Sequence, residues 1–210
     1  MPRPTLQIYS ELQTAYDHFN KELFGGQLPE CILTLDSKEK RVRGYYRHKQ
    51  FIHQGGEPCD GIALNPQHFE TRKIQGIMQI LVHEMCHLWQ AHFGENSPTS
   101  YHDKEWSDKM ESLGLMPSNT GAPGGKKTGQ KMYDYPLEAG MFLKACDGLL
   151  TPEYRISWRD RFSVAPEAAP LGNKSLRMKY SCSCPANIWG KPGLNVLCGE
   201  CGEPFQPKIG

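Results

Sequence analysis

The sequence has no long apolar run and almost no net charge. Its 210 residues carry 24 Lys and Arg against 23 Asp and Glu, a formal net charge of +1. A chain this close to neutral is not a globally basic protein that coats DNA. No stretch approaches the roughly 18 consecutive apolar residues of a membrane helix, and the first residues lack the apolar core of a signal peptide. We therefore expect a cytoplasmic or otherwise intracellular protein that is not secreted and has no membrane partner.

The cysteines lack the even spread of a disulfide framework. Four are scattered singly through the first 150 residues, and four crowd near the end of the chain: Cys182, Cys184, Cys198 and Cys201. Without a secretory signal, clustered thiols favour metal over disulfides. Cys-x-Cys followed after 13 residues by Cys-x-x-Cys offers four thiolates to a closed, tetrahedral structural zinc. We therefore predict a structural zinc at these four cysteines, where Gly199 and Gly202 allow backbone amides to face the sulfurs of Cys198 and Cys201. Two disulfides are the alternative.

The charge is distributed unevenly along the chain. Residues 1–150 have a net charge of −2, whereas residues 151–210 have a net charge of +3. Basic side chains form two strips: Lys38, Lys40, Arg41, Arg43, Arg47 and Lys49, and then Arg155, Arg159, Arg161, Lys174, Arg177 and Lys179. Such strips either contact phosphates or are simply solvated surface. Trp158 and Tyr180, which lie among the second strip, either stack on unpaired bases or pack into a core.

Helical and strand patterns alternate along the first 115 residues, which predicts an α+β fold with helices on a short mixed sheet. Apolar residues at helical spacing predict an N-terminal helix that stops at Gly25-Gly26. Three strands are predicted next, at residues 31–35, 42–46 and 61–66. Two further helices follow at 71–94 and 103–113. A loop at 117–129 and a connector at 151–178 complete the prediction.

The helix predicted at residues 71–94 carries the sequence His83-Glu84-Met85-Cys86-His87. At 100° per residue, counted from Ile74, its apolar residues form one stripe, while His83 and His87 fall near about 180° and 220°. The two imidazoles therefore project together, one turn apart and away from the core, and can share a metal. Glu84 lies on the flank of the pair. Cys86, between the two faces, is expected to be a packed thiol.

These residue types suit metal-assisted hydrolysis. Neutral imidazoles bind Zn²⁺ and leave it strongly Lewis-acidic, and three protein ligands leave a position for water. A carboxylate beside the metal can take the proton of that water as it attacks a carbonyl. We therefore predict a catalytic zinc, with Glu84 activating the zinc-bound water.

The third ligand has several candidates. His92 falls within the apolar stripe at about 0°, so it points away from the pair and is expected to be a partly buried core histidine. Glu95, Glu105 and Glu111 offer carboxylates. His102 is favoured because Gly94 ends the helix and a short turn returns the chain to His102, directly before a new helix.

These motifs resemble the SprT-like metalloproteases, the group that includes bacterial SprT and the Spartan DNA–protein crosslink proteases. The resemblance is carried by Leu23-Phe24-Gly25-Gly26-Gln27-Leu28-Pro29, Ile62-Ala63-Leu64-Asn65-Pro66, the His83–His87 motif, His102 with Trp106, and Trp189–Leu194 before Cys198-Gly199-Glu200-Cys201. It implies a small zincin-like fold, His83, His87 and His102 as zinc ligands, Glu84 as catalytic base, and a C-terminal zinc ribbon. The first cysteine pair departs from the usual spacing, because a single residue separates Cys182 from Cys184.

The combined expectation is a SprT-like metalloprotease domain at residues 1–150, a basic connector at 151–178 and a four-cysteine zinc ribbon at 179–210. The expected activity is zinc-dependent cleavage of protein substrates associated with DNA, with single- or double-stranded DNA held by the connector and ribbon. The alternative is a non-catalytic, zinc-stabilised adaptor that binds DNA or the transcription machinery. Glu84 argues against that alternative, since a purely structural site needs no base.

Overall fold

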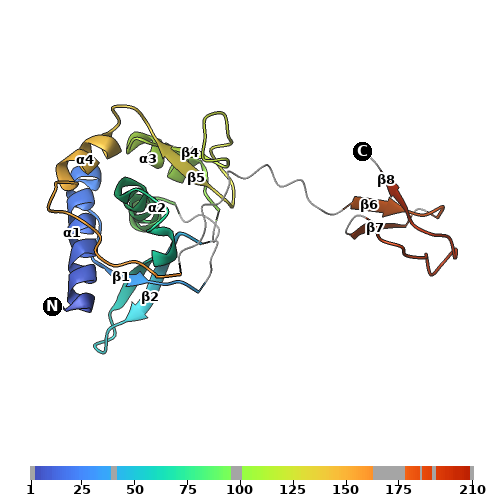
Figure 1. Ribbon diagram of the computed structural model, residues 1–210, viewed down its shortest axis with the longest axis horizontal. Helices are drawn as coiled ribbons and strands as arrows, with labels where there is room; N and C mark the ends of the chain where they lie inside the picture. Colours follow the sequence, from blue (N-terminus) through green and yellow to red (C-terminus); the bar gives the residue numbers. More distant parts are fainter. Residues whose placement is uncertain are drawn as a thin grey trace. The chain divides into compact units, whose positions relative to one another are not determined.

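The computed structural model describes residues 3–38, 42–95, 101–162, 178–184, 186–190 and 193–208. The chain divides into two units, Met1–Ala169 and Pro170–Gly210 (Figure 1). The elements of the first unit are α1 (Pro4–Phe24), β1 (Cys31–Leu35), β2 (Gly44–Ile52), β3 (Pro58–Leu64), a 3₁₀ turn (Pro66–His68), α2 (Ile74–Phe93), α3 (Lys104–Ser112), β4 (Leu115–Ser118), β5 (Tyr133–Pro136) and α4 (Met141–Leu149). The second unit contains β6 (Met178–Ser181), β7 (Asn187–Gly190) and β8 (Gln206–Lys208). The predicted α+β class is confirmed.

The N-terminal helix ends where its glycines predict. Gly25 has a φ of 64° and donates its N–H to the carbonyl of Asn20, and glycine adopts this left-handed conformation without steric cost. The Asn20 side chain then bonds both the N–H and the carbonyl of Leu28, at 3.0 and 3.1 Å. These contacts fold the Leu23–Pro29 segment back toward the first strand.

The sheet of the first unit is mixed, as predicted. Its strand order is β1-β3-β2, with β1 parallel and β2 antiparallel to the central β3. The second and third strands differ from the predicted ranges 42–46 and 61–66 at both ends, because β2 spans Gly44–Ile52 and β3 spans Pro58–Leu64. Residues 47–50 of β2 are polar and exposed, so no apolar alternation marks this part of the strand.

Helix α2 occupies the middle of the first unit (Figure 1). It contacts β2 and β3 on one side and α3 on another, and it also touches α1. Its apolar stripe is buried: Ile77, Met78, Leu81, Val82, Met85 and Leu88 are each less than 5% exposed. The stripe predicted from the sequence is therefore the part of α2 that joins the core.

The segment after α3 holds elements that the sequence patterns did not predict. Strands β4 and β5 pair antiparallel around the loop predicted at 117–129. Helix α4 packs on α1, where the rings of Phe19 and Phe142 stack with centroids 6.0 Å apart. Each of these elements spans nine residues or fewer, too few for a clear periodicity.

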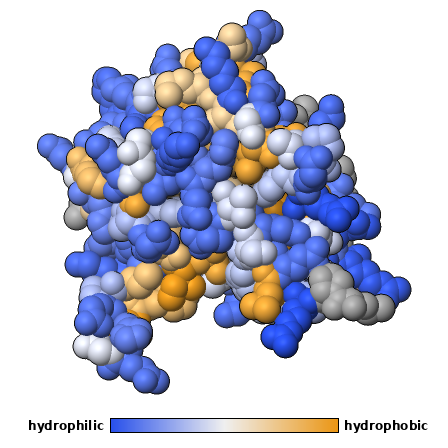
Figure 2. All heavy atoms as spheres, turned by 90° about the vertical axis from the view of Figure 1, so that its left-hand side faces the viewer, coloured by the Kyte–Doolittle hydropathy of each residue, from blue (hydrophilic) through white to orange (hydrophobic). Residues whose placement is uncertain are grey.

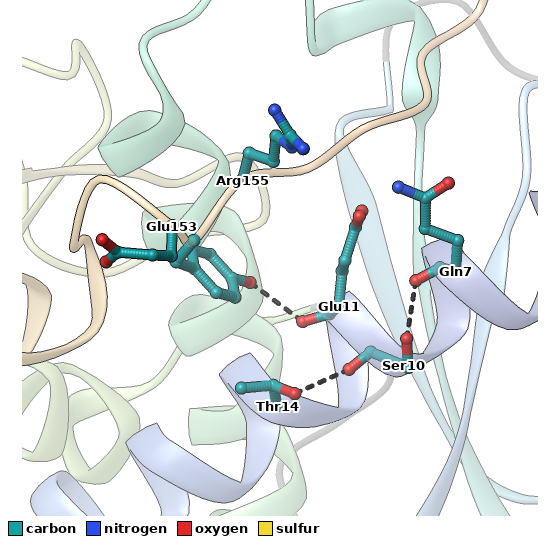
Figure 3. A pocket seen from close by; sticks show the side chains of 7 residues that line it. Gln7, Ser10, Glu11, Thr14, Glu153 and Arg155 are labelled. Atoms are coloured by element: carbon teal, nitrogen blue, oxygen red, sulfur yellow. Dashed lines mark hydrogen bonds between the residues drawn. The ribbon is translucent and has the colours of Figure 1, made fainter. Parts of the chain in front are cut away.

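The first part of the predicted connector packs along α1. The hydroxyl of Tyr154 donates to the carbonyl of Glu11 at 2.9 Å, and the N–H of Ser157 donates to the Glu11 carboxylate at 2.7 Å. Figure 3 shows the Glu11 and Arg155 side chains at the hollow between helix and connector.

The face of the molecule in Figure 2 is mostly hydrophilic, with apolar atoms in separate areas. The division at residues 150 and 178 stays a prediction.

The second unit is a three-stranded sheet of order β7-β6-β8. Among the residues of this unit that the structure describes, Tyr180, Cys198 and Phe205 form a buried apolar cluster. Tyr180 is 2% exposed, which confirms the core-packing alternative for this residue and leaves no free face for base stacking. None of the helices in the described ranges is long and apolar enough to cross a membrane.

Candidate functional site

Three histidines converge between α2 and the residue that precedes the N-cap of α3. The Nε2 atom of His102 lies 3.2 Å from Nε2 of His83 and 3.1 Å from Nε2 of His87. His83 and His87 are presented by successive turns of α2, on the side that faces α3. The structure therefore brings together the three side chains that the sequence predicts as ligands of one metal.

His102 is positioned by two neighbouring segments. Its backbone forms a two-way bridge with Gly129, and its Nδ1 lies 3.0 Å from the Gly129 carbonyl. The next residue, Asp103, caps α3 by accepting from the N–H of Trp106, and its carboxylate also accepts from Gln90 on α2. These bonds tie the start of α3 to both the end of α2 and the loop at 117–129.

The orientation of His83 is fixed by a residue that the sequence analysis missed. Nδ1 of His83 lies 2.9 Å from Oδ2 of Asp134 on β5, and Gln79 donates to Oδ1 of the same carboxylate at 2.7 Å. A carboxylate on the far nitrogen holds an imidazole in the tautomer that leaves Nε2 free for a metal. Asp134 is 51 residues from His83, so no local spacing pointed to it.

The indole ring of Trp106 packs against all three imidazoles. Its ring centroid lies 4.8, 5.2 and 4.3 Å from the centroids of His83, His87 and His102. Trp106 itself is completely buried. Packing of this kind restricts the rotamers of all three histidines, so their nitrogens are placed before any ligand arrives.

Burial favours the neutral form of His87 and His102, because it lowers the pKa of both imidazoles. Burial, with the charge of His83 next, lowers the pKa of His102 to about 4, and burial likewise lowers the pKa of His87 well below its usual value. For His83, burial acts in the same direction, but the bond to Asp134 and the nearby carboxylates outweigh it and raise the pKa. Neutral imidazole is the form that binds metal.

Glu84 lies next to the triad on α2 and is only 6% exposed. Burial raises its pKa to about 7, and a hydrogen bond from the Tyr46 backbone opposes that rise. Strand β2 approaches the carboxylate closely: a Cβ added at Gly44 would lie 3.2 Å from Glu84 Oε1 and 2.8 Å from a methyl carbon of Ile80. A side chain at position 44 would crowd Ile80 and the Glu84 carboxylate, so glycine is needed there.

The donor set fits a tetrahedral metal ion. His83 and His102 engage Asp134 and Gly129 through Nδ1, so their Nε2 lone pairs point toward one another. Two such lone pairs repel unless a cation or a proton lies between them. Two nitrogens bound to one zinc at 2.0–2.1 Å are about 3.3 Å apart, close to the 3.1–3.2 Å found here.

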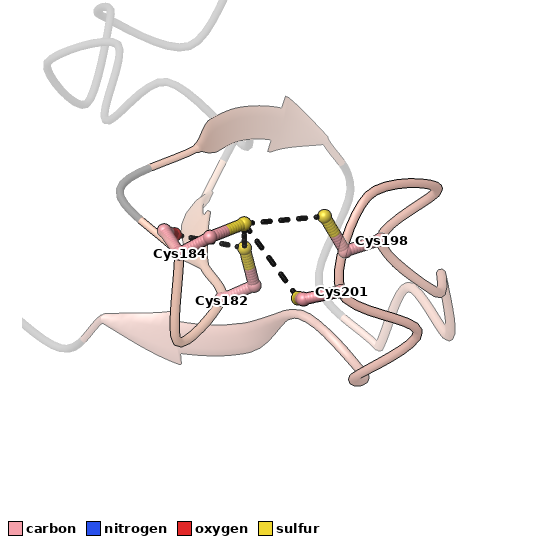
Figure 4. A group of neighbouring side chains, drawn as sticks. All are labelled: Cys182, Cys184, Cys198 and Cys201. Atoms are coloured by element: carbon pink, nitrogen blue, oxygen red, sulfur yellow. Dashed lines mark hydrogen bonds between the residues drawn. The ribbon is translucent and has the colours of Figure 1, made fainter.

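The second cluster consists of the four cysteines near the C-terminus (Figure 4). Sγ of Cys184 lies 2.9 Å from Sγ of Cys182, 3.5 Å from that of Cys198 and 3.6 Å from that of Cys201. All four are free thiols, so the disulfide alternative is not adopted here. Despite the unusual Cys-x-Cys spacing, the first pair faces the second, and the group can hold a metal ion.

Backbone amides face the second cysteine pair. The N–H groups of Cys201 and Glu200 lower the pKa of Cys198, and the N–H of Glu203 lowers that of Cys201 to about 6. Gly202 has a φ of 72°, the left-handed conformation that this turn needs. A lowered thiol pKa favours the thiolate, which is the form that binds metal.

The other candidate residues lie outside the histidine triad. Glu105 accepts from Gln90 and from the backbone of Glu95, whereas Glu111 pairs with Lys127. Cys86 is completely buried, which confirms the packed-thiol interpretation. Lys40, Arg41, Lys174 and Arg177 of the basic strips lie outside the described residues.

The fold and the site define an α+β protein whose histidine triad and cysteine cluster can each hold a metal ion. A sequence model of the SprT-like family matches residues 12–124. The chain belongs to the SprT-like family. It is also 51% identical over 49 residues to an uncharacterized protein in the mucB 3′ region of Salmonella typhimurium. That match covers 23% of this chain and 65% of the relative, less than two thirds of its length.

Proposed function

We propose that the chain is a zinc-dependent endopeptidase of the SprT-like type that cleaves proteins associated with DNA. His83, His87 and His102 would hold the catalytic zinc in a zincin-like domain at residues 1–150. The cysteine cluster would hold a structural zinc in a ribbon at 179–210, joined by the basic connector at 151–178. The observation that carries the proposal is the convergence of three imidazole nitrogens beside a buried carboxylate on the same helix.

Each residue of the site has a defined task in peptide hydrolysis. A zinc ion held by the triad would supply a Lewis acid that polarises the peptide carbonyl and acidifies water. The Glu84 carboxylate takes the proton of the attacking water and returns it to the departing amine nitrogen. Without metal, burial raises the pKa of Glu84 to about 7, and a carboxyl whose pKa lies near the working pH can both accept and release a proton. Asp134 and Gly129 keep the imidazoles of His83 and His102 oriented.

The proposed association with DNA rests on the second basic strip. Arg155, Arg159 and Arg161 are exposed, although Arg159 also pairs with Glu70 at 3.0 Å. The indole N–H of Trp158 donates to Gln7 at 3.1 Å, yet the residue stays 43% exposed. Guanidinium groups beside an exposed aromatic ring suit phosphates and unpaired bases.

Replacement of Glu84 by glutamine tests the catalytic part of the proposal. Glu84→Gln keeps the size and polarity of the side chain but removes the base. We expect cleavage of a DNA-bound protein to fall by at least roughly 10²-fold at unchanged metal content. Glu138→Gln, the same change at an exposed glutamate, is the matched control. His102→Ala should be inactive for a different reason, because it removes a ligand and weakens metal binding.

The comparison is made by mass spectrometry of cleavage products, with single-stranded, double-stranded and no DNA present. Equal rates for the parent and Glu84→Gln at matched zinc content would show that Glu84 is not the base. If neither cuts under any DNA condition, the chain is instead the non-catalytic, zinc-stabilised adaptor.

A further inference from the structure

His92 belongs to a third cluster of side chains, separate from the triad and the cysteines. The cluster consists of His48 on β2, Asp60 on β3 and His92 in the last turn of α2. Nε2 of His92 lies 2.5 Å from Oδ2 of Asp60, and Nδ1 of His48 lies 3.1 Å from Oδ1. The three ligand atoms all lie within 4.8 Å of one another.

The backbone conformation of β2 near Lys49 brings this strand into contact with the Asp60 carboxylate. Asp60 is only 4% exposed, and its Oδ1 accepts the backbone N–H of Lys49 at 2.5 Å. Lys49 has a φ of +49°, and the pairing of β2 with β3 shifts register between Arg47 and Phe51. A non-glycine residue in this conformation is strained, and such strain and such bulges concentrate at functional sites. Here both features turn β2 onto the Asp60 carboxylate.

The donor set has a definite chemical preference. Two imidazoles and one carboxylate suit divalent first-row transition metals, whereas calcium and magnesium prefer oxygen ligands throughout. The buried carboxylate supplies negative charge for the cation. The imidazoles of His48 and His92 keep 43% and 32% of their side-chain surface exposed, so an ion can enter and complete its coordination with water.

The cluster lies apart from the triad on the same helix. His92 follows His87 by five residues, about 7.5 Å along the axis of α2 and about 140° around it. Strand β2 runs past both places, because the Tyr46 backbone contacts Glu84 and the Tyr46 hydroxyl lies 3.1 Å from Nδ1 of His48. An ion at the cluster would fasten β2 to the end of α2.

We propose that His48, Asp60 and His92 form an additional metal site, occupied by a divalent transition-metal ion such as zinc, that clamps β2 onto α2. The site uses none of the proposed ligands of the other two metals. Its presence or absence therefore says nothing about peptidase activity, and the two proposals fail independently.

Zinc itself is the probe for this site. The full-length chain is dialysed against buffers of stepped free zinc concentration, and bound metal per chain is measured by mass spectrometry. We expect His92→Gln to bind one equivalent less than the parent. His48→Gln, at a side chain that is 43% exposed, should lose the same equivalent. The control His53→Gln changes a histidine in the β2–β3 turn that is 76% exposed and contacts Gly55 and Glu57 of the same turn, and it should match the parent.

The outcome is read as a difference between variants, so the number of ions at the other sites does not affect it. Folding of each variant is checked by circular dichroism before dialysis. Equal zinc content for the parent and both glutamine variants at every free zinc concentration would overturn the proposal. Asp60 would then simply accept hydrogen bonds from two imidazoles.

Discussion

The histidine triad and the cysteine cluster depend on the rest of the chain in opposite ways. The triad lies in a unit with an extensive core, on a helix buried against a sheet and a second helix, and a buried tryptophan supports all three rings. The cysteine cluster lies in a unit whose described residues include a small buried apolar cluster of Tyr180, Cys198 and Phe205. In the first unit the fold positions the proposed ligands, whereas in the second the proposed ligands themselves make up much of the described core.

This difference indicates different roles for the two proposed metals. A small module with little core takes most of its folding free energy from its metal, about 10–16 kcal/mol in zinc-finger peptides. We expect a triad held by the core and by hydrogen bonds to keep its fold without metal, which would leave its proposed ion free to serve chemistry. Four thiolates close a coordination sphere, while three imidazoles leave a position open.

The largest effect is expected from Cys198→Ser. Loss of one thiolate opens the four-sulfur site, and with it the second unit should lose its folded structure, while the first unit stays intact. Amide NMR spectra of the full chain, compared with those of the parent, measure both units at once. Cys59→Ser, at a free thiol on β3, is the control. Retention of the β6–β8 signals in Cys198→Ser would show that the module folds without its metal.

A smaller effect is expected from Asp134→Asn. The amide cannot hold His83 in the tautomer set by the carboxylate, and loss of such a partner typically costs 10–100-fold in metal affinity or activity. Zinc affinity and cleavage rate measure the change, with folding expected to be preserved. Asp108→Asn, at an exposed carboxylate that pairs with Lys104, should match the parent. Unchanged affinity and rate in Asp134→Asn would mean that core packing alone orients His83.

The smallest effect is expected on DNA affinity, when basic residues of the two units are replaced by alanine. Alanine at Arg155, Arg159, Arg161 and Lys179 should weaken DNA binding moderately and flatten its dependence on salt, because fewer counterions are released. The slope of log affinity against log salt concentration measures this. A slope equal to that of the parent would make these residues solvated surface and not phosphate contacts.

The sequence predicted the parts of the site that depend on local spacing. His83 and His87 are one turn apart on a helix whose apolar stripe is continuous, so their common direction followed from helix geometry. His102 could be predicted because Gly94 ends α2 and Asp103 is a good cap for α3. The four cysteines were predictable for the same reason, since their spacing lies within 20 residues.

Contacts between distant segments could not be predicted in this way. Asp134 and Gly129 reach the triad through the β4–β5 hairpin, whose short strands carry no clear periodicity. The helical angle correctly separated His92 from the triad, but the expected core position is wrong, because His92 is exposed. Its contact with Asp60, however, depends on a bulge in β2 and a left-handed Lys49, which no sequence pattern marks.

Stepwise metal removal tests the contrast between the two clusters most directly. The full-length chain, loaded with zinc, is treated with increasing chelator while cleavage of a DNA-bound protein and the amide NMR signals of both units are recorded. The open triad should release its ion first, so cleavage should stop while the second unit is still folded. Stronger chelation should then unfold the second unit and leave the first unit folded. If the second unit unfolds while cleavage continues, or the first unit unfolds with the loss of its metal, the assignment of a catalytic triad and a structural cysteine cluster is wrong.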